Sequence, residues 1–145
     1  MNPFFMHRFE EATLALLRVM AGLLFMQHGA QKLFGALGGF GGQPGATAPL
    51  MSQMGLAGVL EFFGGLLVAF GLFTRPVAFV LAGQMAVAYF TAHLPQGFWP
   101  ILNGGELAAL FCCVFLYFSA RGGGRYSLDG MIGRGRPDEA RDRAV

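Results

Sequence analysis

Four charged side chains lie inside segments that are otherwise apolar enough to cross a bilayer. They are Arg18, Lys32, Glu61 and Glu106. A charged group at membrane depth costs about 2.5 kcal/mol or more even on lenient insertion scales. Two positive and two negative residues held there imply internal ion pairs, a hydrated cavity or a bound ligand. The sequence therefore directs the search for a function to this quartet.

Three neutral polar residues extend the set. His28 and Gln31 lie beside Lys32 at the end of the first apolar segment, and His93 ends the third. Imidazole titrates close to neutral pH and can carry a proton. A cavity that mixes acid, base and amide suits a quinone-like or oxyanion headgroup. The predicted ligand-binding or proton-relay residues are Arg18, His28, Gln31, Lys32, Glu61, His93 and Glu106, with no metal site and no residue assigned to catalysis.

A purely structural interpretation stays open at this stage. Arg18 could pair with Glu61, and Lys32 with Glu106, so that the charges only fix how the helices dock. Buried ion pairs can specify helix registry without taking part in chemistry. The two cysteines, Cys112 and Cys113, are adjacent in an apolar run without a C-x-x-C spacing, which favours packing over a redox role.

The composition excludes most soluble classes of protein. Of 145 residues, 54% are hydrophobic and 12% are charged, whereas soluble domains have about a quarter of their residues charged. Six of the ten Lys and Arg residues follow residue 120, so the preceding chain is nearly free of charge. The net charge of +2 and the absence of a basic stripe argue against nucleic acid as a partner.

Four apolar segments can position the candidate residues: 12–34, 50–73, 77–93 and 103–120. A helix needs about 20 residues to cross a hydrocarbon core of about 30 Å, and lipid leaves no other partner for the backbone polar groups. Prolines occur before or between these segments, where helices begin or end. We expect an all-α, integral membrane four-helix bundle over residues 1–129. A polar cytoplasmic tail, 130–145, is expected to be disordered.

The basic residues predict the orientation. Arg8, Arg75 and the six arginines after residue 120 all fall on one side of the predicted spans, and the other two connections, 35–49 and 94–102, carry no charge. The positive-inside rule then places both termini in the cytoplasm. At about 1.5 Å per residue along a helix, Arg18 lies in the inner half of the bilayer and most other candidates in the outer half. We expect a multi-pass protein of the plasma (inner) membrane.

Short motifs along most of the chain resemble the DoxX family of small four-helix bacterial membrane proteins. The matching pieces, in chain order, are Leu17-Arg18, His28-Gly29-Ala30-Gln31-Lys32-Leu33-Phe34-Gly35, Glu61-Phe62-Phe63-Gly64-Gly65, Gly71-Leu72-Phe73-Thr74-Arg75, Asn103-Gly104-Gly105-Glu106-Leu107 and Gly122-Gly123-Gly124-Arg125-Tyr126-Ser127-Leu128-Asp129. Their order and spacing carry the resemblance. It implies a membrane protein linked to redox chemistry. One branch of the family is associated with thiosulfate:quinone oxidoreductase, and others with complexes that handle thiol or oxidative stress.

Three hypotheses of function follow. The first is a membrane subunit of a redox system that binds a quinone or similar small molecule, with no covalent cofactor. If it takes part in an enzyme, the resemblance implies an accessory subunit of a thiosulfate- or thiol:quinone oxidoreductase. The second is a scaffold that docks a redox partner protein through its arginine-rich tail, and the third is a small proton-coupled transporter. Beyond the lipid bilayer, a redox partner or further copies of the chain are the expected partners.

Overall fold

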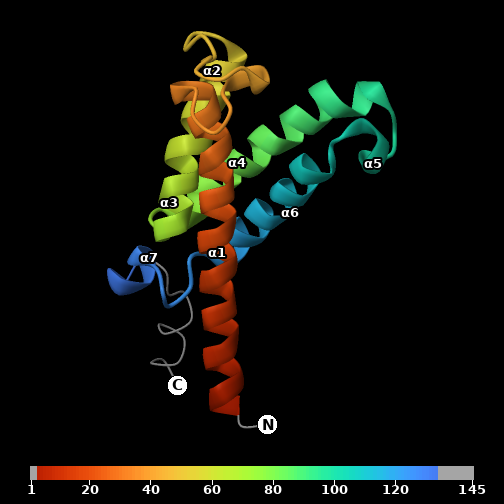
Figure 1. Cartoon of the computed structure of the whole chain (residues 1–145). Helices are drawn as coiled ribbons and strands as arrows, with labels where there is room; N and C mark the ends of the chain where they lie inside the picture. The colour runs from red at the N-terminus through yellow and green to blue at the C-terminus, as the bar shows by residue number, and fades with distance from the viewer. Residues whose placement is uncertain (1–2, 134–145) are drawn as a thin grey trace.

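The computed structural model describes residues 3–133, and the chain is all-helical within this range (Figure 1). The first helix, α1, runs without interruption from Pro3 to Phe34. A loop that contains the short 3-10 turn η1 (Phe40–Gly42) leads to α2 (Gln53–Val59). The wide π turn η2 (Leu60–Gly64) and α3 (Gly65–Phe70) continue α2 into one rod.

The second half of the chain forms another pair of rods. Helix α4 (Thr74–Ala88) continues through the π turn η3 (Tyr89–His93) into the 3-10 turn η4 (Leu94–Gln96). The short helix α5 (Pro100–Asn103) then reverses the chain into α6 (Glu106–Arg121).

One short helix, α7 (Leu128–Met131), follows α6 and ends the described part. It reaches two residues into the segment 130–145 that the sequence predicts to be disordered. Residues 134–145 of that segment lie outside the described residues.

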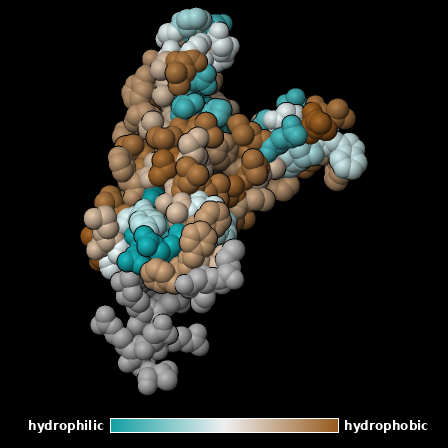
Figure 2. Space-filling view, turned by 60° about the horizontal axis from the view of Figure 1, so that its bottom comes forward, coloured by the Kyte–Doolittle hydropathy of each residue, from teal (hydrophilic) through white to brown (hydrophobic). Residues whose placement is uncertain are grey.

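Two of these helical segments are long and apolar enough to cross a membrane. They are Gln53–Phe70, which joins α2, η2 and α3, and Thr74–Gln96, which joins α4, η3 and η4. They coincide with the second and third apolar segments of the sequence. Figure 2 shows hydrophobic side chains over much of the surface in that view, with hydrophilic residues gathered towards the extremities of the molecule.

The four rods pack as two pairs that form a V rather than a closed bundle. Helix α1 packs along α2, η2 and α3, while α4 packs along α6. The pairs meet where α4 contacts α3 and η2, and beyond this level they diverge (Figure 1). We call the meeting point the junction and the region between the diverging pairs the cleft.

Glycines and aromatic rings hold the V together. A Cβ atom on Gly22 of α1 would lie 2.5 Å from the carbonyl oxygen of Gly65, so only glycine permits this close contact of α1 with α3. Small residues are the usual means of close helix packing in membranes. Between the two pairs, the ring of Phe25 lies 4.8 Å from that of Phe115 and 5.2 Å from that of Phe111, measured between centroids.

The junction is closed by two buried charges. Arg18 donates to the carbonyl oxygens of Val68 (2.7 Å) and Ala69 (2.5 Å) at the end of α3, and to that of Tyr126 (2.7 Å). Asp129 accepts from the backbone N–H groups of Phe73 and Thr74 at the start of α4. Arg18 thus satisfies carbonyls at the end of α3, and the segment after α6 folds back to cap the start of α4.

Candidate functional site

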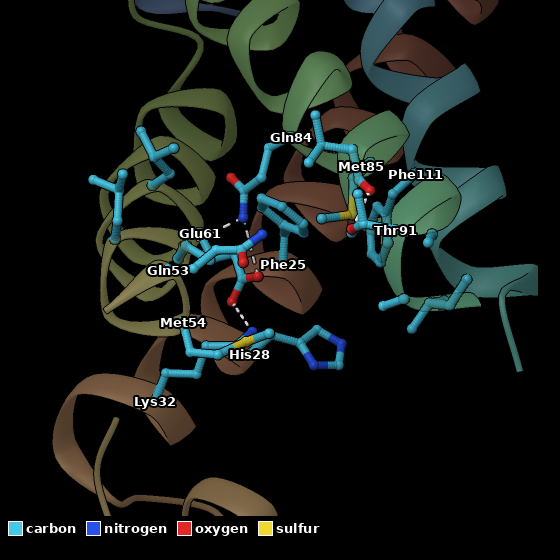
Figure 3. A pocket seen from close by; sticks show the side chains of 18 of the residues that line it. Phe25, His28, Lys32, Gln53, Met54, Glu61, Gln84, Met85, Thr91 and Phe111 are labelled. Carbon is cyan, nitrogen blue, oxygen red and sulfur yellow. Dashed lines mark hydrogen bonds and ion pairs between the residues drawn. The ribbon is translucent and has the colours of Figure 1, made fainter. Parts of the chain in front are cut away.

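A cleft of about 540 Å³ lies between the two helix pairs. Its lining comes from α1, the α2–η2 rod, the α4–η3 rod and α6. Most of the lining residues are apolar. The polar ones, several of which are labelled in Figure 3, are His28, Lys32, Gln53, Glu61, Gln84, Thr91 and His93. Three of the four helix rods thus contribute polar groups to one cavity.

Glu61 is the centre of this polar group. It lies in the π turn η2 with only 4% of its surface exposed. Its Oε2 atom forms an ion pair with Lys32 Nζ of α1, and its Oε1 atom accepts a hydrogen bond of 3.1 Å from Gln84 Nε2 of α4 (Figure 3). A buried carboxylate needs such partners to offset the loss of its hydration. The three side chains tie the two arms of the V together at the floor of the cleft.

His28 lies one helical turn before Lys32 on α1 and lines the same cleft. It is half-buried, and no hydrogen bond joins it to any of residues 3–133. Its ring nitrogens are therefore available to a ligand, beside a lysine and a carboxylate that already bind each other. This combination offers both hydrogen-bond donors and a proton carrier to one headgroup.

His93 reaches the cleft from the opposite arm. Its Nδ1 atom lies 3.0 Å from the carbonyl oxygen of Asn103. Because a carbonyl only accepts, Nδ1 carries the proton of the ring, and Nε2 is the acceptor in the neutral form. The sidechain of Asn103 in turn binds Gly97 O and Gly105 N, at 2.6 and 2.7 Å, which fixes the turn on which this carbonyl lies.

Gln84 was missed as a site residue by the sequence reasoning. A regular helix places residues 84 and 93 on opposite sides, since nine steps of about 100° make half a turn more than two full turns. The π turn η3 lies between them and accommodates an extra residue per turn, which changes this phase. Both residues therefore line one cleft. The available signal was a glutamine in the middle of an apolar helix.

Arg18 is not part of the cleft, and the predicted pairing of Arg18 with Glu61 is wrong. Its guanidinium binds three backbone carbonyls at the junction, and Lys32 takes the place beside Glu61. Arg18 and Lys32 are 14 positions apart on a continuous helix, which corresponds to about 21 Å. The two basic residues of α1 therefore act at different levels of the molecule, Arg18 at the junction and Lys32 at the cleft.

Two other predicted residues also lie outside the cleft lining. Gln31 donates to the carbonyl oxygen of Leu37 at 2.8 Å, beyond the end of α1. Glu106 is exposed in the first turn of α6, where its charge is favourable to the helix dipole. The predicted pairing of Lys32 with Glu106 is not formed, because Lys32 binds Glu61. The structure thus places His28, Lys32, Glu61 and His93 in one cavity and Arg18, Gln31 and Glu106 elsewhere.

Another buried acid, Glu11, also escaped the sequence reasoning. Its carboxylate binds Arg121 Nη2 at 2.5 Å and accepts from the backbone N–H of Arg125 at 2.6 Å. These contacts join the start of α1 to the end of α6 and carry no feature of a ligand site. Cys112 is half-buried and Cys113 exposed, and both are free thiols. Within residues 3–133 no three metal-binding side chains come together.

The DoxX family model matches residues 13–94. An "Uncharacterized protein" of Haemophilus influenzae is 40% identical over 86% of this chain and 93% of its own length. The "Putative oxidoreductase CatD" of Bacillus subtilis is 31% identical over 88% of this chain and 92% of its own. The "Inner membrane protein YqjF" of Escherichia coli is 28% identical over 89% of this chain and 98% of its own length.

No solved structure matches the chain. The family model covers more than half of the residues, including most of α1, Glu61 and most of the α4 rod. The relatives align over nearly their full lengths, and one of them is named as an inner membrane protein. This chain belongs to the DoxX family of membrane proteins.

Proposed function

We propose that the protein is a membrane subunit of a redox system and binds a quinone or a similar small molecule in the cleft. The observation that carries this proposal is the meeting of Lys32, Glu61 and Gln84 at the floor of a mainly apolar cavity, with His28 beside them. Small-molecule sites are typically apolar cavities with a few convergent polar groups. The name of the Bacillus subtilis relative, an oxidoreductase, is consistent with it.

Each polar residue has a role in this proposal. His28 and Lys32 donate hydrogen bonds to an oxygen of the headgroup. Glu61 balances the charge of Lys32 and passes protons, while Gln84 holds its other oxygen. His93 offers a second proton-carrying group from the other arm. Arg18, Gln31 and Glu106, which lie outside the cleft, are assigned no contact with the ligand.

The membrane topology belongs to the same proposal. The four rods span the inner membrane with both termini in the cytoplasm, and the cleft lies in the outer half. The arginines near the junction, such as Arg75 and Arg121, are on the cytoplasmic side in this arrangement, as the positive-inside rule requires. Impermeant maleimides applied to whole cells would label a cysteine at Met51 but not one at Arg125. If only the Arg125→Cys variant were labelled, the orientation would be opposite to the one proposed.

A titration of purified protein in nanodiscs with a soluble ubiquinone analogue tests the binding. We expect His28→Ala to weaken binding by about tenfold, since one hydrogen bond to a charged or polar group contributes on the order of 1.5 kcal/mol. We expect Glu61→Gln to weaken it as well, because Lys32 then loses its counter-ion. Two matched controls are available. Glu106→Gln makes the same chemical change outside the cleft, and His7→Ala removes an exposed imidazole from the same helix.

The result also distinguishes the structural alternative. If the Lys32–Glu61 pair serves only to dock the helices, Glu61→Gln destabilises the protein while His28→Ala leaves quinone affinity unchanged. Equal affinity of the wild type and His28→Ala, each measured on folded protein, would contradict the proposal.

A further inference from the structure

We propose that the ligand of the cleft is a lipid-borne amphiphile with a long apolar tail, which enters sideways between α2 and α4. This inference rests on the proposed function and deepens it. It adds the chemical class of the ligand and the path by which the ligand enters the cleft. A small water-soluble compound arriving from the outer face is the contrary case.

The composition of the cleft separates a polar floor from apolar walls. At the floor, Lys32, Glu61 and Gln84 bind one another. The walls carry the polar side chains of Gln53, Thr91 and His93 but are formed mainly by aliphatic and sulfur-containing side chains, which offer no hydrogen bonds to a soluble ligand. The apolar ones include Met54, Leu56, Leu60, Val80, Val87 and Leu107. A molecule that fits both parts carries a polar headgroup and an apolar extension.

The side of the cleft is open along these walls. Leu56 on α2 and Val87 on α4 line the cavity, yet 61% and 53% of their surfaces are exposed. A closed pocket would bury such residues. Their exposure shows that the gap between the two rods continues from the cavity to the outside of the protein. The divergence of the two helix pairs is visible in Figure 1.

The surroundings of this gap are set by the two rods that border it. The α2–η2–α3 rod and the α4–η3–η4 rod are the two segments identified above as apolar and long enough to cross a membrane. A gap between two membrane-crossing helices opens into lipid, where an apolar tail costs nothing to accommodate. If the gap opened into water, the exposed side chains of Leu56 and Val87 would be in contact with water, which is unfavourable.

The size of the cavity agrees with a ligand larger than a bare ring. Its volume of about 540 Å³ falls in the range of about 300–1,000 Å³ that suits drug-sized molecules. A single substituted ring beside Glu61 would fill only part of this volume. The first part of an isoprenoid or alkyl tail would fill more of it.

The test compares two quinones with one headgroup in nanodiscs. Ubiquinone-0 has no tail and decylubiquinone has a ten-carbon tail. Because a tail also raises the concentration in the bilayer, affinities are expressed per mole fraction in the membrane, after the partition of each compound has been measured. We expect decylubiquinone to bind at least tenfold more tightly on this scale. Equal affinities would overturn the tail contact while leaving headgroup binding intact.

A variant at the gap provides the second readout. Val87→Trp adds bulk at the exposed mouth, and we expect it to weaken decylubiquinone binding at least tenfold with less than a threefold effect on ubiquinone-0. Phe90→Trp is the control, since Phe90 is exposed on the same rod and does not line the cleft. An equal effect of both variants, or a co-purified phospholipid that decylubiquinone fails to displace, would overturn the inference. If neither quinone binds the wild type, the proposed function itself fails.

Discussion

Lys32 and Glu61 form an ion pair across 29 positions of sequence, at the point where α1 meets the π turn of the second rod. The pair offsets part of the hydration that the Glu61 carboxylate loses on burial. The pair leaves one carboxylate oxygen for Gln84, and this second bond reaches the opposite arm of the V. One carboxylate thus connects three helices and forms the floor of the cleft.

Removal of one partner of this pair is predicted to be costly. Glu61→Gln leaves the Lys32 charge with an amide in place of a carboxylate, and breaking a buried pair in this way typically costs about 3–5 kcal/mol. We expect a lower thermal unfolding midpoint in detergent, measured by intrinsic fluorescence. Glu106→Gln, at an exposed position, is expected to shift the midpoint little. In a double-mutant cycle, Lys32→Met should cost much less in the Glu61→Leu background than in the wild type.

At the junction, Arg18→Lys is predicted to destabilise the protein although it keeps the charge. The planar guanidinium reaches three carbonyl oxygens on two segments, and a lysine ammonium does not reproduce this fork. Each carbonyl left buried without a partner costs about 1–3 kcal/mol. We expect faster proteolysis after α6, near Arg125, which a time course with trypsin would reveal. Arg8→Lys, on the exposed start of α1, serves as the control.

Two glycine substitutions are predicted to act in opposite directions. Gly22→Ala places a methyl group against the backbone of Gly65 and must push α1 away from α3. In Gly83→Ala the new methyl group meets nothing within 4 Å. An exposed helical glycine replaced by alanine stabilises by about 0.5–1 kcal/mol. Unfolding midpoints of the two variants should therefore fall on either side of the wild type, and a loss in both would contradict the packing described for α4.

The Glu11 contact is predicted to make the protein sensitive to acid. Burial alone raises the pKa of Glu11, but the hydrogen bond from Arg125 N–H and the charge and bond of Arg121 outweigh it and hold the pKa below its usual value of 4.5. A depressed pKa in the folded state contributes stability that is present above about pH 4.5 and is lost as the pH falls through the folded value.

Unfolding midpoints measured between pH 7 and pH 3 would test this effect. The wild type should lose stability towards the acid end, and Glu11→Gln should lose less because it lacks the titrating group. Glu10→Gln provides the control. The side chain of Glu10, next to Glu11 in the sequence, is far more exposed, and its Oε1 atom lies 3.7 Å from Arg121 Nη2. A pH profile of Glu11→Gln parallel to that of the wild type would contradict the assignment.

The apolar pattern predicted more of the fold than of the site. Segment lengths and prolines place the second and third rods, because a bilayer requires long uninterrupted helices. Small residues mark close helix contacts in membranes, and Gly58, Gly64 and Gly65 beside Glu61 are buried. Partner choice was less accessible, since residue type alone allows Arg18 or Lys32 to bind Glu61. The divergence of the arms and the π turns depend on packing between distant segments, which periodicity does not encode.

The position of Asp129 has a consequence for how the chain is assembled. Arg18 is synthesised with the first helix, yet one of the carbonyls that it binds belongs to Tyr126, and the cap of α4 comes from Asp129. During synthesis the Arg18 guanidinium and the start of α4 therefore remain incompletely satisfied until Tyr126 and Asp129 have left the ribosome. A chain truncated just before Gly122 should still form the two helix pairs, but the junction between them should lack the contacts of Tyr126 and Asp129.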